Sequence, residues 1–158
     1  MSRRSIVIAT DTASDDAIAL VLAVREPSVD VRAVTVVAGN VPLDLAVRNA
    51  IVTLDLAGGA EIPLHAGRDR PLVRPLDTAQ FVHGTDGMGG ADLPEPSRGA
   101  TSNDAVGALL DIAANEPGRH DLVTLGPLTN IAAALERDAE FLTRFGHTYL
   151  MAGSPDGV

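Results

Sequence analysis

The sequence contains no cysteine and no tryptophan, and it has only three phenylalanines and one tyrosine among 158 residues. The lack of cysteine excludes disulfide bonds, a thiolate nucleophile and any metal centre held by cysteine sulfur. Because aromatic side chains are so few, the core must be built from Leu, Val, Ile and Ala. The hydrophobic share of 46% is high enough for a folded domain and argues against intrinsic disorder.

Basic residues are also few, with 12 Lys and Arg against 21 Asp and Glu and a formal charge of −9. Nucleic acids and anionic membranes both attract positively charged surfaces, so neither is an expected partner. The apolar run at residues 6–9 is too short for a signal peptide or a membrane-spanning helix. These absences predict a soluble, cytoplasmic protein with one globular domain over residues 1–158.

Apolar, β-branched stretches alternate along the chain with stretches of helical spacing. Two-sided hydrophobicity, as in residues 29–37, is typical of strands buried on both faces of a parallel sheet. The pattern therefore predicts an α/β fold, with an open, mainly parallel, Rossmann-like sheet and helices on both faces. We expect strands at residues 5–10, 29–37, 62–65, 121–125 and 148–151, and helices at residues 17–25, 43–57, 101–115, 129–137 and 138–145.

One long segment does not follow this alternation. Residues 66–101 are rich in Pro, Gly, Asp and Arg and lack periodicity, which predicts a long, mobile loop region. Loops of this length in compact domains are usually functional. We expect Thr101 or Ser102 to cap the helix that follows the loop, and Thr129 to cap the helix at residues 129–137.

Polar clusters follow three of the predicted strands. Asp11, Asp15 and Asp16 follow the first strand, Asn40 follows the second, and residues 126–130 follow the strand at residues 121–125. The carboxyl ends of parallel strands meet at one edge of the sheet, and ligands of open α/β sheets bind outside that edge. We therefore expect the three clusters to lie together and to form the functional site.

Three carboxylates within six residues allow two interpretations. Asp15 could simply cap the helix that follows it. Alternatively, a divalent cation offsets the repulsion among the three charges, with calcium or magnesium favoured over zinc because only oxygen ligands are present. The spacing excludes an EF-hand, which needs glycine where Asp16 stands and glutamate where Leu22 stands.

Four ordered sequence elements point to one family. They are Asp-x-x-x-Asp-Asp-Ala at residues 11–17, a Val-x-Gly-Asn-like stretch at residues 37–40, His-Gly-x-Asp-Gly at residues 83–87, and Leu-Gly-Pro-Leu-Thr-Asn-Ile-Ala at residues 125–132. From residue 6 to its C-terminus, the chain resembles the inosine-uridine-preferring nucleoside hydrolases. These are calcium-dependent enzymes of nucleoside salvage that cleave the N-glycosidic bond of ribonucleosides.

The resemblance implies a calcium site. Asp11 would be a calcium ligand and the base that deprotonates the attacking water, Asp16 would be a second ligand, and Thr129 would offer its backbone carbonyl. The transition state of glycosidic cleavage resembles an oxocarbenium ion, so an activated water and an anionic wall under the sugar both favour the reaction. Thr129 could also act only as a helix cap.

The resemblance also implies a substrate site. Asp15 would hold ribose hydroxyls, Asn40 would contact the sugar, and His83 would lie near the nucleobase on a mobile loop. Without its Gly-x-Asp-Gly context, His83 could equally be an ordinary surface histidine. The other three histidines, His65, His120 and His147, lack such a context and are interpreted as structural or solvated.

The chain departs from the family pattern at several residues, Ala9 and Ala152 among them, and in its length. It has Thr12-Ala13 where the family usually has Pro-Gly, which matters if Ala13 needs a positive φ. The second departure is length, because family members are about twice as long and contribute further sugar and calcium ligands from their second half. The resemblance thus implies that residues 1–158 are the N-terminal portion of a nucleoside hydrolase. The second half of the family pattern would begin near residues 153–158.

This difference in length leads to two hypotheses. In the first, the chain is a nucleoside hydrolase portion that has weak or no turnover unless a complementing C-terminal half is present. In the second, it is a non-catalytic module that binds calcium or ribosides, or that self-associates through aliphatic surface around residues 149–151. The resemblance also suggests homo-oligomers, and it does not determine the base preference.

Overall fold

Five parallel strands form a single sheet in the order β3-β2-β1-β4-β5. This arrangement is seen in a computed structural model of the protein that describes residues 3–153. It confirms the predicted α/β class and the parallel sheet. The strands are β1 (Arg4–Thr10), β2 (Val29–Val36), β3 (Leu64–Ala66), β4 (Asp121–Thr124) and β5 (Thr148–Leu150).

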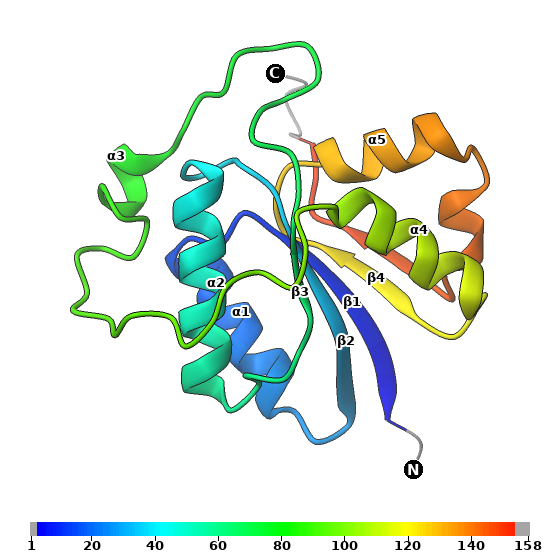
Figure 1. Ribbon diagram of the computed structural model, residues 1–158, viewed down its shortest axis with the longest axis horizontal. Helices are drawn as coiled ribbons and strands as arrows, with labels where there is room; N and C mark the ends of the chain where they lie inside the picture. Colours follow the sequence, from blue (N-terminus) through cyan, green and yellow to red (C-terminus); the bar gives the residue numbers. More distant parts are fainter. Residues whose placement is uncertain (1–2, 154–158) are drawn as a thin grey trace.

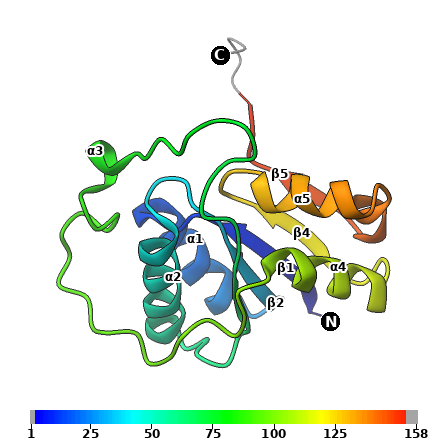
Figure 2. The same ribbon diagram turned by 45° about the horizontal axis from the view of Figure 1, so that its top comes forward.

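Helices cover both faces of the sheet, as Figures 1 and 2 show. The helices α1 (Ser14–Arg25) and α2 (Leu43–Ala57) pack on one face. The helices α4 (Ala105–Asn115) and α5 (Thr129–Arg137) pack on the other, together with a 3-10 turn at Phe141–Arg144. None of the helices within residues 3–153 is both long and apolar enough to cross a membrane.

The hydrophobic core has two layers because successive side chains of a strand point to opposite faces. Val7 of β1 lies in the layer under α4 and α5, and the next residue, Ile8, lies in the layer under α1 and α2. Both layers are mainly aliphatic, as the composition requires. The exception is an edge-to-face pair of Phe141 and Phe145, whose ring centroids are 5.3 Å apart.

The ends of three helices differ from the expectation. The helix α1 begins at Ser14, and Ala13 precedes it with a φ of −107°, so no positive φ is required there. No side chain caps α1, so Asp15 is not its cap. Thr129 is the first residue of α5 and likewise makes no capping hydrogen bond.

The start of α4 also corrects the prediction. The cap is Asp104, whose Oδ1 accepts a hydrogen bond from the Gly107 N–H at 2.8 Å. The backbones of Thr101 and Ser102 instead form hydrogen bonds with strand β3. The Thr101 N–H donates to the Leu64 carbonyl at 2.7 Å, and the Ala66 N–H donates to the Ser102 carbonyl at 2.9 Å. These bonds satisfy the outer edge of β3, and the sequence alone gives no signal for them.

The segment at residues 66–101 contains one short helix, α3 (Gln80–His83), which the sequence analysis did not predict. Figure 2 shows the segment reaching out beyond α2. Hydrogen bonds to the backbone on both sides of α3 attach the middle of the segment to the domain. The Ala79 N–H donates to the Asn40 carbonyl at 2.9 Å, and Asn49 Nδ2 donates to the Asp86 carbonyl at 2.8 Å. Its mobility stays a prediction.

Candidate functional site

A cavity of about 450 Å³ lies at the carboxyl ends of the strands. Four residues that the sequence singled out line it: Asp11, Asp15, Asn40 and His83. The remaining wall is formed by residues 125–128 and 151–153. The expectation that polar clusters from separate strands meet at one edge is therefore met for Asp11, Asp15, Asn40 and residues 126–128, and His83 joins them from the segment at residues 66–101.

Asp11 follows β1 and is only 3% exposed. Its Oδ2 accepts a hydrogen bond from the Asn40 N–H at 2.6 Å. Two glycines make room for the carboxyl group. A Cβ at Gly126 would lie 2.6 Å from Asp11 Oδ1, and a Cβ at Gly39 would collide with Asp11 Oδ2. Glycine at these two positions thus allows the backbone to approach the carboxylate closely.

Asp16 lies behind Asp11, is also 3% exposed, and does not line the cavity. Its Oδ2 accepts hydrogen bonds from Thr10 Oγ1 and from the Asp11 N–H. Thr10 Oγ1 in turn accepts from the Thr12 N–H at 3.1 Å and lies 2.9 Å from Thr12 Oγ1. A hydroxyl has one proton, and that of Thr10 goes to Asp16, so the Thr12 hydroxyl donates to Thr10. This chain of donors holds Asp16 in place.

Burial dominates the electrostatics of the two aspartates. The pKa of Asp16 is raised to about 7, mainly by burial and also by the charges of Asp11 and Asp15, against the hydrogen bond from Thr10. Burial also raises the pKa of Asp11, against the hydrogen bond from the Asn40 backbone. Among residues 3–153, no Arg, Lys or His side chain forms an ion pair with either carboxyl group. Two buried acids without a basic partner fit a divalent cation.

The carboxylates alone do not complete a metal site. No group of three or more His, Cys, Asp or Glu side chains within residues 3–153 is arranged to hold a metal ion. Calcium takes about six to eight oxygen ligands, so it would need main-chain carbonyl groups and water in addition to Asp11 and Asp16. The oxygen-only donor set agrees with calcium or magnesium.

Leu125 is a candidate ligand that the sequence analysis missed. Its N–H donates to the Ala9 carbonyl at 2.7 Å, which continues the ladder between β1 and β4. In an unbroken parallel ladder, the Leu125 carbonyl would accept from the Asp11 N–H. That N–H donates to Asp16 instead, which frees the Leu125 carbonyl. Leu125 lines the cavity, whereas Thr129 is buried at the start of α5 and does not.

Asn130, in the same motif, has a structural role. Its Nδ2 donates to the Val36 carbonyl at 3.0 Å, and its Oδ1 accepts from the Arg68 N–H at 3.0 Å. The side chain thereby joins the end of β2 to the start of the segment at residues 66–101. Only the contact between these distant segments identifies this role.

His83 and Asp15 face each other at the other side of the cavity. The helix α3 carries His83, and α1 carries Asp15 in its first turn. His83 Nδ1 lies 3.1 Å from Ser14 Oγ and 3.9 Å from Asp15 Oδ1. The Asp15 side chain is 63% exposed, so its carboxylate is open to a ligand.

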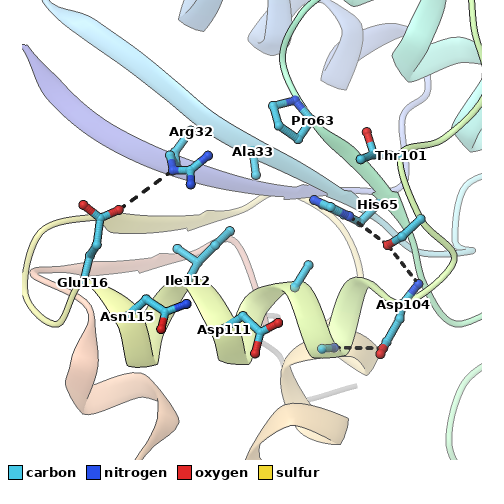
Figure 3. Close-up of a pocket in the computed structure, with 13 residues that line it drawn as sticks. Arg32, Ala33, Pro63, His65, Thr101, Asp104, Asp111, Ile112, Asn115 and Glu116 are labelled. Carbon is cyan, nitrogen blue, oxygen red and sulfur yellow. Dashed lines mark hydrogen bonds and ion pairs between the residues drawn. The ribbon is translucent and has the colours of Figure 1, made fainter.

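A larger cavity, of about 510 Å³, lies between β2, β3 and α4 (Figure 3). Its described wall includes none of the site residues predicted from the sequence. Several of its charged and polar groups already pair with one another. Arg32 Nε lies 3.9 Å from Glu116 Oε2, and His65 Nδ1 lies 2.9 Å from Ser102 Oγ. We therefore locate the candidate site at the smaller cavity, where the buried carboxylates lack such partners.

The family of inosine-uridine preferring nucleoside hydrolases matches residues 6–158 of this chain. An uncharacterised protein of Schizosaccharomyces pombe is 46% identical over 150 residues, which cover 94% of this chain and 48% of the relative. The probable uridine nucleosidase 2 of Arabidopsis thaliana is 38% identical over 154 residues, which cover 96% and 48%. The chain thus spans about half the length of the curated relatives that it matches.

A solved structure agrees with the sequence comparisons. The structure of a plant nucleoside hydrolase superposes on this chain with a TM-score of 0.90 at 36% sequence identity. The match covers 96% of this chain and 48% of that one. The family match spans nearly the whole sequence, and the fold agrees with it. This chain therefore belongs to the inosine-uridine preferring nucleoside hydrolase family.

Proposed function

We propose that this protein takes part in the calcium-dependent hydrolysis of the N-glycosidic bond of ribonucleosides, which releases ribose and a free base. The observation that carries the proposal is the pair of buried carboxylates, Asp11 and Asp16, without a basic partner among residues 3–153. Membership of the family supports the reaction class. The similarity to the probable uridine nucleosidase 2 of Arabidopsis thaliana supports a ribonucleoside as the substrate.

Asp11 and Asp16 would hold the ion, with the Leu125 carbonyl as a further oxygen and Thr129 as the alternative predicted from the sequence. Bound calcium would lower the pKa of a nearby water and so ease its deprotonation near neutral pH. Asp11 would accept the proton of that water.

Asp15, Asn40 and His83 would bind the substrate. The exposed carboxylate of Asp15 is suited to accept hydrogen bonds from two ribose hydroxyls. Its negative charge also favours the positive charge that develops on the sugar in the transition state. Asn40 and His83 line the same cavity and would contact the sugar and the base, respectively.

Ligand binding with weak or no catalysis is a second candidate function for these 158 residues. Among the described residues, Asp11 and Asp16 are the two carboxylates assigned to calcium, and Tyr149, Leu150 and Met151 at the end of strand β5 are about half exposed. We therefore propose weak or no turnover by this chain alone. Calcium or riboside binding without catalysis, or assembly with a complementing half or a second copy, would account for the same features.

Calorimetric calcium titration tests the metal site. We expect the wild type to bind calcium and the Asp11→Ala, Asp16→Ala double variant not to bind it. Gly126→Ala should weaken binding about 10- to 100-fold, because the new Cβ displaces Asp11. Gly99→Ala is the matched control, since no atom lies within 4 Å of a Cβ at that position. Equal calcium binding by the wild type and the double variant would contradict a metal site at Asp11 and Asp16.

An assay of base release from inosine and uridine tests the catalytic part. With calcium present, we expect slow or undetectable release by the 158-residue chain. Release that depends on calcium and is lost in the Asp11→Ala variant would support catalysis through Asp11. Turnover as fast as that of a full-length relative would contradict the proposed impairment.

A further inference from the structure

The short helix α3 exposes its apolar side chains and partly buries its histidine. Its apolar side chains face solvent, with Phe81 90% and Val82 64% exposed. The side chain of His83 is only 15% exposed and points toward α1. Burial of apolar surface therefore contributes little to the position of α3, and the contacts of the His83 ring matter more.

Both described contacts of this ring involve the same nitrogen. Ser14 Oγ lies 3.1 Å from Nδ1, and Asp15 Oδ1 lies 3.9 Å from Nδ1. His83 and Asp15 line the cavity, but Ser14 does not. Ser14 therefore reaches the ring from behind the cavity wall, and Nε2 is the nitrogen left available to a ligand.

The two neighbours of Nδ1 also favour one tautomer. A neutral imidazole carries its proton on one nitrogen, and the hydrogen bond of the other nitrogen decides which. A carboxylate near Nδ1 favours a proton there, because an N–H group is attracted to negative charge and a lone pair is repelled by it. The Ser14 hydroxyl oxygen can then accept the Nδ1 proton.

We propose that Ser14 is a positioning residue that, together with Asp15, holds His83 as the Nδ1–H tautomer with an unprotonated Nε2. The proposed function supplies the consequence. Nε2 would take up a proton from solvent and pass it to the departing base as the N-glycosidic bond breaks, which returns the ring to its neutral Nδ1–H form. Ser14 acts only through His83 and touches no substrate. The orientation and tautomer of the ring follow from contacts within this chain and do not require turnover.

NMR of the histidine rings tests this directly in the 158-residue chain. At alkaline pH, where imidazoles are neutral, the ¹⁵N shifts of His83 should identify Nδ1 as protonated and Nε2 as unprotonated. In Ser14→Ala, the separation between the two ¹⁵N shifts should shrink as the other tautomer becomes populated. Ser14→Thr keeps the hydroxyl and should restore the wild-type pattern.

The other histidines provide an internal control. His65, with its own serine contact at Ser102, and His120, with Ser5, should keep their ring shifts in Ser14→Ala. An Nε2–H tautomer of His83 in the wild type would overturn the proposal, and so would unchanged His83 shifts in Ser14→Ala. Neither result depends on calcium binding or base release, so a failure here is distinct from a failure of the proposed function.

Discussion

Asp16 combines deep burial with a hydrogen-bond network that selects its position. Thr10 and the Asp11 amide both donate to its Oδ2, while the charges of Asp11 and Asp15 oppose its ionisation. Holding a carboxylate there costs free energy that a bound cation would offset. This residue should therefore couple stability to both pH and calcium.

The pH dependence has a definite sign. The pKa of Asp16 is raised from 3.8 to about 7, so the native state binds more protons than the unfolded state between these values. The free energy of unfolding contributed by Asp16 is therefore present below about pH 4 and falls as the pH rises to about 7. At about 1.4 kcal/mol per pKa unit, we expect a fall of a few kcal/mol in the presence of a chelator.

Urea unfolding at a series of pH values measures this effect. Asp16→Asn should flatten the slope between about pH 4 and pH 7, and saturating calcium should flatten it in the wild type. Asp111→Asn is the control, because this exposed aspartate on α4 should leave the slope unchanged. A wild-type slope equal to that of Asp16→Asn without calcium would contradict the raised pKa.

At the scale of elements, the segment at residues 66–101 depends on how it is attached to α2. Gly87 has a φ of +77°, and a Cβ there would lie 2.6 Å from Val41 Cγ1. Asn49 of α2 reaches the same turn through the Asp86 carbonyl. The turn is therefore packed against the domain, although most of the segment is exposed.

Alanine substitutions at two glycines separate backbone strain from packing. Gly89 has a φ of +68° and nothing within 4 Å of a Cβ, so Gly89→Ala should cost only about 1 kcal/mol. Gly87→Ala adds the collision with Val41 and should cost about 1–3 kcal/mol more. Urea unfolding gives the free energies, and hydrogen exchange of the nearby amides should rise more in Gly87→Ala. Equal costs for the two variants would show that the turn is not packed against Val41.

The sequence predicted most of the helices and strands, but it predicted fewer of the residues at which they begin and end. The helical spacing of apolar residues identified the four long helices, because this spacing is a local property of the sequence. The role of Thr101 depended on a contact with β3, which lies far away in the sequence, and with Thr101 paired there the cap of α4 fell to Asp104. The helix α3 is only four residues long and has no buried side chain, so no periodic signal was available.

At the scale of the whole molecule, the two edges of the sheet differ. Residues 101 and 102 satisfy the outer edge of β3, whereas no strand within residues 3–153 pairs with the outer edge of β5. Tyr149, Leu150 and Met151 are 48%, 47% and 60% exposed. An unpaired strand edge with apolar side chains promotes pairing with another chain.

We therefore expect this chain to self-associate with increasing concentration, which light scattering or sedimentation would detect. Leu150→Lys should shift the protein toward monomer, because a lysine on an edge strand opposes pairing. Leu72→Lys is the matched control, since Leu72 is also 47% exposed but lies outside the sheet. A monodisperse monomer at high concentration, or an equal effect of both lysines, would rule out the β5 edge.

The sequence by itself determined the parallel α/β fold, the family, and the meeting of Asp11, Asp15 and Asn40 at one sheet edge. The fold follows from local periodicity, the shared edge from the rule that parallel strands end at the same side of the sheet, and the family from the resemblance of four ordered motifs. Only the tertiary structure decided that Asp16 lies behind the cavity, that Leu125 lines it, and that Ser14 contacts His83. Each of these depends on which backbone and side-chain groups remain free once distant segments have paired, and a linear pattern does not contain that information.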